Sequence, residues 1–227
     1  MNWLEILAFV GFPYLALATF VVGHTYRYVT DAFGWNARSS ELLDKESLRT
    51  GITVFHWGIL FTLVGHAGGL LIPQQLYDAV GIVGQTHSKI AYFSGWAVGV
   101  AALAGILLLL WRRLSRPRIR ATTTMNDWIT LLLLVWVIGA GLYNVAFEHF
   151  YVLDTIAPWI RSIVTLRPDP TLMREVPLSY EVHILSALAL LGFSPFSRLV
   201  HIWSVPLTYL FRRYVVFRRR GRECVSE

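Results

Sequence analysis

Five long apolar runs limit what this chain of 227 residues can fold into. Each run is about 20 residues long, the length that an α-helix needs to cross the hydrocarbon core of a bilayer. Only 15% of the residues are charged, against about 25% in a soluble domain. We therefore expect an all-α membrane protein with five transmembrane helices in one bundle. The expected spans are Trp3–Gly23, Gly51–Ile72, Ile90–Trp111, Trp128–Phe147 and Tyr180–Val200.

No linker divides these spans into separate units, so residues 1–203 are expected to form one membrane domain. Residues 204–227 mix aromatic and aliphatic side chains with arginines. Such a segment lies on the inner membrane surface as an amphipathic helix or docks to another protein. We predict that it is a cytoplasmic tail that docks to partner subunits.

Basic residues predict the orientation of the chain, because cytoplasmic connections of membrane proteins are enriched in Lys and Arg. The first connection, the third connection and the tail are rich in these residues, whereas the second connection holds only Lys89. The N-terminus is therefore expected outside and the C-terminus in the cytoplasm. A net charge of +6 is also found in nucleic-acid-binding proteins, but these arginines flank apolar runs. We expect membrane lipid, and no nucleic acid, as a partner.

Histidines are the main functional signal. His56 and His66 lie in the second expected span, and His183 and His201 lie in the fifth. Ionisable groups are costly in a bilayer and are functional candidates there, although a single intramembrane His is often only a helix–helix hydrogen-bonding group. Because the two spans run in opposite directions, His56 is expected level with His201 and His66 with His183. Histidines from facing helices can bind one haem iron axially, so we predict two b-type haems, one above the other.

The spacing along the chain supports this pairing only in part. His56 and His66 are separated by about 15 Å of helix rise, but His183 and His201 are separated by about 27 Å. Helix tilt and a kink at Pro195 are expected to absorb part of the difference. We therefore expect tilted haems.

Five glycines lie along the second span, and they allow two interpretations. Small residues let two helices pack closely, or they leave room for the face of a porphyrin. The glycines are Gly51, Gly58, Gly65, Gly68 and Gly69.

Two further features point to a redox site. Haem propionates are anions that require cationic partners, and Arg198 precedes His201 by three residues. It is the candidate partner, with a basic anchor at the inner surface as the alternative. His87 and Lys89 lie near the outer end of the second span, where a proton acceptor would assist quinol oxidation. Their alternative is a solvated loop.

The chain has one cysteine, Cys224, so it cannot supply the four cysteines that an iron–sulfur cluster requires. Any such cluster that exchanges electrons with this chain must lie in another subunit.

Three stretches resemble the gamma subunit of respiratory nitrate reductases, and the similarity covers nearly the whole chain. They are the segment Pro195–Pro206, the segment Ser115–Thr124 and the segment Val64–Gly69. The resemblance implies a five-span, di-haem b quinol dehydrogenase in the bacterial or archaeal cell membrane. It also implies two cytoplasmic partners, an iron–sulfur beta subunit and a molybdenum-containing alpha subunit that reduces nitrate in anaerobic respiration.

The resemblance further implies individual roles. His56 and His201 would bind the inner haem, and His66 and His183 the outer haem. In the best-known member, the resemblance implies that a Lys near the start of the third helix helps to bind quinol. His87 occupies that position here, and Lys89 follows two residues later.

The sequence therefore predicts a membrane cytochrome b that oxidises quinol near the outer face. Electrons would pass through two bis-histidine haems to the iron–sulfur partner. The alternatives are the cytochrome b subunit of a formate dehydrogenase, a hydrogenase or a sulfur-metabolising complex, and a haem-free membrane scaffold or transporter.

Overall fold

The computed structural model describes residues 2–31, 46–82, 84–148 and 150–203. These residues are helical and include no β-strand. Five of their helices are long and apolar enough to cross a membrane, which confirms the predicted fold class. The tail 204–227, with its expected docking role, lies outside the described residues. The orientation of the termini stays a prediction.

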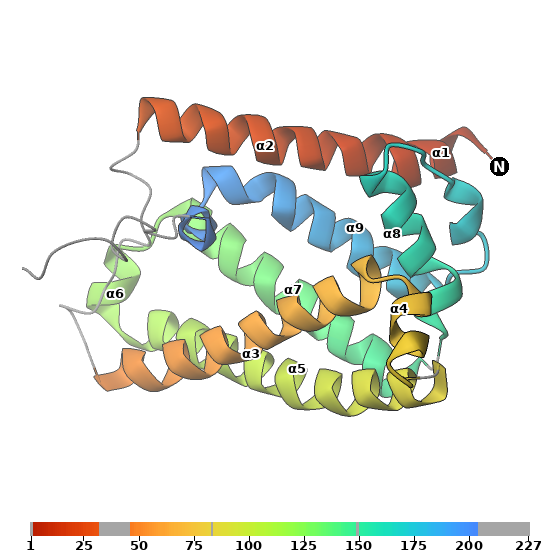
Figure 1. Cartoon of the computed structure of the whole chain (residues 1–227). Helices are drawn as coiled ribbons and strands as arrows, with labels where there is room; N and C mark the ends of the chain where they lie inside the picture. Colours follow the sequence, from red (N-terminus) through yellow and green to blue (C-terminus); the bar gives the residue numbers. More distant parts are fainter. Residues whose placement is uncertain (1, 32–45, 83, 149, 204–227) are drawn as a thin grey trace, which may run out of the picture.

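The five long helices run alongside one another (Figure 1). The first consists of α1 (Trp3–Ile6), the π-helical turn η1 (Leu7–Gly11) and α2 (Phe12–Thr30). The other four are α3 (Glu46–Leu71), α5 (Gly84–Ser115), α7 (Met125–Phe147) and α9 (Leu178–Phe193). The shorter elements are α4 (Gln74–Ala79), α6 (Pro117–Ala121), η3 (Val152–Asp154), α8 (Ile156–Val164), η4 (Pro170–Met173), η5 (Ser194–Phe196) and η6 (Arg198–Ile202).

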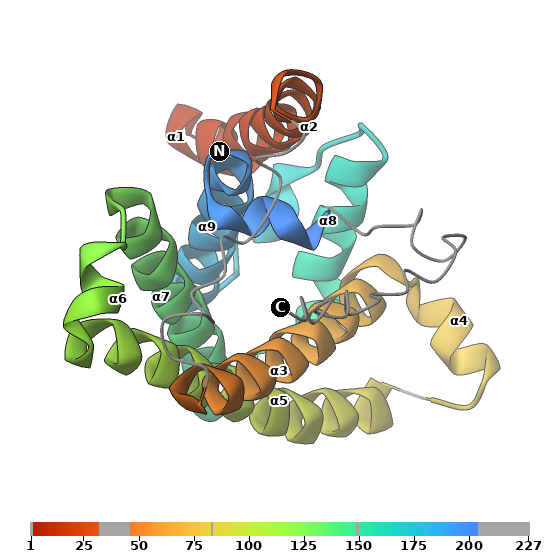
Figure 2. The same ribbon diagram turned by 90° about the vertical axis from the view of Figure 1, so that its left-hand side faces the viewer.

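The order of packing places α3 opposite α9. Helix α3 packs on α5, α5 on α7, α7 on α9, and α9 on α2. Helix α8 packs on α3 on the remaining side. Viewed along the bundle in Figure 2, α3 and α9 face each other, with α7 on one side and α8 on the other, and α5 lies behind α3. The two helices that carry the candidate histidines therefore face each other across the bundle centre.

Glycines allow α3 and α5 to approach closely. A Cβ atom on Gly58 would lie 2.5 Å from the backbone N of Ala102, and one on Gly105 would lie 2.3 Å from the backbone N of Phe55. Only glycine fits at such backbone-to-backbone contacts. Gly58 therefore serves helix packing, whereas a Cβ on Gly65 would meet nothing within 4 Å. Of Gly58 and Gly65, only Gly65 remains a candidate for leaving room for a cofactor.

Helix α8 closes one end of the bundle beside α3. Its Trp159 is only 2% exposed, and the indole Nε1 donates to the carbonyl of Phe9 in η1 over 3.0 Å. From the same helix, Arg161 donates to the carbonyl of Leu70 over 3.2 Å, near the end of α3. These bonds tie α8 to both the first helix and α3 (Figure 1).

The fifth span differs from the expectation of one kinked helix that continues to Val200. Helix α9 ends at Phe193, and the 3₁₀ turn η5 follows. Pro195 has no N–H to continue the helical hydrogen bonds, and Ser197 is extended (φ −117°, ψ −178°) before η6 begins. Figure 2 shows the blue chain turning away from the axis of α9 and crossing the end of the bundle.

This turn explains how two pairs of histidines with different spacings along the chain can lie at the same two levels. His183 lies ten residues before the end of α9, and His56 lies ten residues before His66 in α3. After Phe193 the chain leaves the axis of α9 and crosses the end of the bundle (Figure 2). His201 is thereby brought to the level of His56.

Candidate cofactor-binding site

Two pairs of imidazole rings lie between α3 and the fifth span. The ring centroids of His56 and His201 are 6.0 Å apart, and those of His66 and His183 are 6.2 Å apart. The same two pairs were predicted from the opposite directions of the second and fifth spans. Their role as haem ligands stays a prediction.

Both separations suit one iron held between two axial imidazoles. A metal ion binds an imidazole nitrogen at about 2 Å, and the ring centroid lies about 1.2 Å behind that nitrogen, so two axial ligands have centroids roughly 6 Å apart. No group of three or more His, Cys, Asp or Glu able to hold a metal lies among the residues that the structure describes. A pair of imidazoles is nevertheless sufficient for haem, because the porphyrin supplies the other ligands.

Every ring of the two pairs has its Nδ1 atom bound to a backbone carbonyl. The partners are Ile52 for His56 (2.8 Å), Thr62 for His66 (2.8 Å), Val137 for His183 (3.1 Å) and Arg198 for His201 (2.6 Å). A carbonyl only accepts, so each Nδ1 carries the hydrogen. The Nε2 lone pair of each ring is then the one that can bind a metal, and a carbonyl on the other nitrogen is the usual partner of a metal-binding His.

Gly141 on α7 makes room for the ring of His183. A Cβ atom at Gly141 would lie 2.8 Å from Cε1 of His183. Sequence reasoning missed this residue, because a glycine in an apolar run gives no indication of which neighbour it faces. Across from this ring, His66 is exposed within the described chain, beside the open space at Gly65.

Arg198 has a partner that the sequence did not indicate. Its guanidinium forms a two-pronged ion pair with Asp127 at the start of α7; Nη2 lies 2.6 Å from Oδ2, and Nε bonds Oδ1. Asp127 is only 4% exposed. The expected contact of Arg198 with a haem propionate stays a prediction. The sequence Thr124–Asp127 was recognisable as a helix cap, but not as half of an ion pair across 71 residues.

His87 and Lys89 lie within α5 and not in an irregular segment. The His87 ring packs against Tyr77 of α4, with centroids 4.7 Å apart, and its Cε1 lies 4.0 Å from where a Cβ of Gly69 would be. His87 is half-buried and Lys89 is exposed. Residues two apart point to different sides of a helix. Only His87 therefore faces the end of α3 that carries His66.

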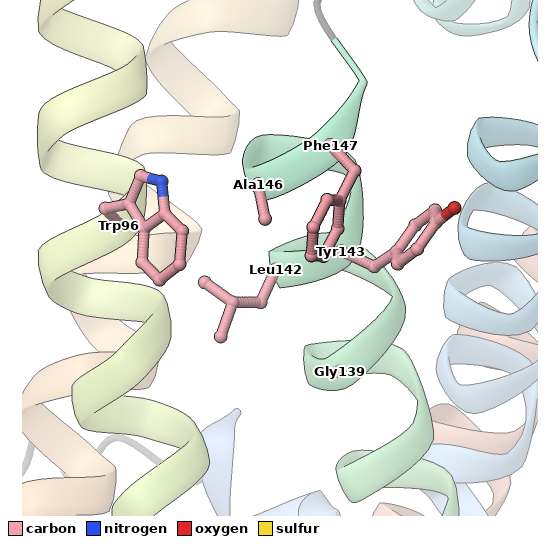
Figure 3. A pocket seen from close by; sticks show the side chains of 6 residues that line it. All are labelled: Trp96, Gly139, Leu142, Tyr143, Ala146 and Phe147. Carbon is pink, nitrogen blue, oxygen red and sulfur yellow. The ribbon is translucent and has the colours of Figure 1, made fainter.

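An apolar hollow lies apart from these residues, between α5 and α7. Its volume is about 330 Å³. Figure 3 shows Trp96 of α5 across from side chains of α7. The lining consists of Trp96, Gly139, Leu142, Tyr143, Ala146 and Phe147. It includes none of the candidate site residues.

Similarity to known proteins covers nearly the whole chain. A family model described as "Nitrate reductase gamma subunit" matches residues 5–220. The nitrate reductase gamma chain of Bacillus subtilis (strain 168) is 44% identical over 213 residues, which is 92% of this chain and 96% of that protein. The respiratory nitrate reductase 1 gamma chain of Escherichia coli (strain K12) is 37% identical over 225 residues, covering 97% of this chain and 100% of its own length. The nitrate reductase-like protein NarX of Mycobacterium tuberculosis (strain ATCC 25618 / H37Rv) is 41% identical over 214 residues, covering 92% of this chain and 33% of that protein.

Proposed function

The chain belongs to the nitrate reductase gamma subunit family, and from this membership we propose that it is the quinol-oxidising cytochrome b of a respiratory nitrate reductase. The proposal rests on the two pairs of imidazole rings, whose centroids are 6.0 Å apart in one pair and 6.2 Å apart in the other. The hydrogen bonds at Nδ1 support it, since they make Nε2 the metal-binding nitrogen of each ring.

Each couple would hold one haem b. His56 and His201 would bind the inner haem, and His66 and His183 the outer one. The haems, when bound, supply stepwise transfer of single electrons. The protein orients all four rings through backbone carbonyls of its own helical segments, so these histidines would need little rearrangement to hold the haems.

Quinol is proposed to bind beside the His66 end of α3. Its oxidation to quinone releases two electrons and two protons. The imidazole of His87 is suited to accept a proton from a quinol hydroxyl, because an imidazole nitrogen can act as a general base. Lys89, exposed on another side of α5, is the second candidate for binding or deprotonating the quinol.

The proposed partners follow from the direction of electron flow. With the basic connections in the cytoplasm, protons leave on the outer side and electrons reach the inner side. An iron–sulfur beta subunit would accept them there and pass them to the molybdenum-containing alpha subunit that reduces nitrate.

We expect two b-type haems per chain in the purified complex. The reason is that two separate couples of imidazoles have the spacing of axial ligands. A pyridine haemochrome assay, normalised to the amount of this chain, measures the number. One haem or none in a fully loaded preparation would contradict the proposal.

Quinol-dependent reduction of nitrate by the same preparation tests the electron acceptor. A preparation that reduces quinone but does not reduce nitrate would favour another quinone-linked complex.

Replacing His87 with Gln is expected to slow quinol oxidation by about 100-fold, the lower range of general-base contributions. Lys89→Gln should have a smaller effect, because Lys89 is exposed and does not share the side of α5 that His87 presents to α4. Stopped-flow reduction of the haems by quinol measures both rates, with haem content as the control. Normal quinol kinetics in the double variant would exclude both residues from the reaction.

A further inference from the structure

The segment that presents His201 is not part of a long helix and depends on other elements for its position. After α9 ends at Phe193, the chain passes through η5 and an extended residue before η6. Three carbonyls of this turn accept hydrogen bonds from side chains of other helices, namely those of Pro195, Phe196 and Ser197.

Helix α2 supplies one set of donors. Nη1 of Arg27 donates to the carbonyl of Pro195 over 2.7 Å and to that of Ser197 over 3.0 Å. Pro195 also packs closely against α2, because a Cβ atom at Gly23 would lie 2.8 Å from Cβ of Pro195. The turn is therefore held in contact with α2.

Helix α7 supplies the other set. Nδ2 of Asn126 donates to the carbonyl of Phe196 over 3.0 Å. The adjacent residue, Asp127, forms the two-pronged ion pair with Arg198. A second cation lies near, since Nη1 of Arg113 is 4.0 Å from Oδ2 of Asp127. Hydrogen bonds to charged groups are stronger than neutral ones, and the two prongs fix the guanidinium in one orientation.

The residue whose side chain forms this ion pair also holds the ring of His201 through its backbone. The carbonyl of Arg198 accepts the Nδ1 hydrogen of His201 over 2.6 Å. A displacement of Arg198 therefore moves the hydrogen-bond acceptor that sets the rotation of the imidazole. The corresponding acceptors of His66 and His183 are carbonyls within the long helices α3 and α7.

We propose that Asp127 is a positioning residue for the inner haem, which acts through Arg198 on the orientation of His201. Arg27 and Asn126 hold the same turn from its two sides. The proposal rests on the haem-binding function proposed above. Outer-shell partners of a ligating His tune both its orientation and its basicity, so their loss alters the properties of the metal that the ring binds.

The test uses Asp127→Asn in the full-length chain within its complex. The amide keeps the size of the side chain and an oxygen for the backbone N–H of Thr124, which now donates to Asp127 over 2.9 Å. It removes the charge that holds Arg198. We expect a changed low-spin EPR signal and a shifted midpoint potential for the inner haem, with both values unchanged for the outer haem. Arg198→Lys should give the same pattern, since lysine cannot form two parallel bonds.

Thr124→Ala is the matched control, because Thr124 Oγ1 accepts from the N–H of Asp127 at the start of α7 but is not bonded to Arg198. If Asp127 acted only as a helix cap, this variant would alter the inner haem as strongly as Asp127→Asn. That result would overturn the proposal, and so would equal changes at both haems, or none, in Asp127→Asn and Arg198→Lys. Wild-type protein without haem would instead contradict the proposed function.

Discussion

His66→Ala and His201→Ala are each expected to remove one haem and to leave the other. His66 and His183 form one couple, and His56 and His201 form the other, at separate levels of the bundle. An iron that loses one of two axial ligands loses much of its affinity. Since even changes to the partners of metal ligands cost about 10–100-fold in affinity or activity, we expect quinol-dependent nitrate reduction to fall below about one hundredth.

Optical redox titration and EPR distinguish which haem is missing. His183→Ala should reproduce the spectrum of His66→Ala, and His56→Ala that of His201→Ala. Nitrate reduction driven by a soluble donor that reduces the partner subunits directly serves as the control, because it bypasses this chain. Loss of the same haem in His66→Ala and His201→Ala, with the other intact, would show that the proposed pairing is wrong.

Gly58→Ala and Gly105→Ala are expected to destabilise the bundle strongly. The added Cβ would lie 2.5 Å and 2.3 Å, respectively, from a backbone nitrogen of the facing helix. A backbone atom cannot move aside as a side chain does, so α3 and α5 must separate along their contact. Overpacking typically costs about 1–3 kcal/mol, and we expect values at or above the upper end here.

Gly139→Ala is the matched control, since a Cβ on this glycine of α7 would meet nothing within 4 Å. Alanine also has the higher helix propensity, by about 1 kcal/mol. Equilibrium unfolding in mixed detergent micelles compares the three variants with the wild type. Equal stabilities for Gly58→Ala, Gly105→Ala and Gly139→Ala would mean that α3 and α5 do not touch at these glycines.

Much of the fold is predictable from apolar runs, because a membrane permits few arrangements of the backbone. The spans were located to within a few residues at α3 and α7, where polar residues mark the ends. The first helix continues to Thr30, seven residues beyond the expected Gly23. Aromatic and small residues such as Tyr26 and Thr25 are compatible with either a helix or a loop, so hydropathy alone could not decide.

The pairing of the histidines was also accessible from the sequence, since it depends only on helix direction. The path of the chain after Pro195 was not. Proline predicts a break, but the direction taken afterwards depends on Arg27 and Asn126, which lie far away in the sequence. The ion pair of Asp127 with Arg198 was hidden for the same reason. Local patterns report what a residue does within its own helix, and not which distant group it meets.

The turn after α9 also has an electrical consequence. It keeps the two levels of imidazoles ten residues of α3 apart, which is a rise of about 15 Å, or half of a hydrocarbon core about 30 Å thick. One charge that crosses the whole core works against about 2.3 kcal/mol per 100 mV of membrane voltage. An electron that moves from the His66 level to the His56 level would therefore work against about half of that. One further helical turn between the levels would add about 5.4 Å to the path and raise the work in proportion.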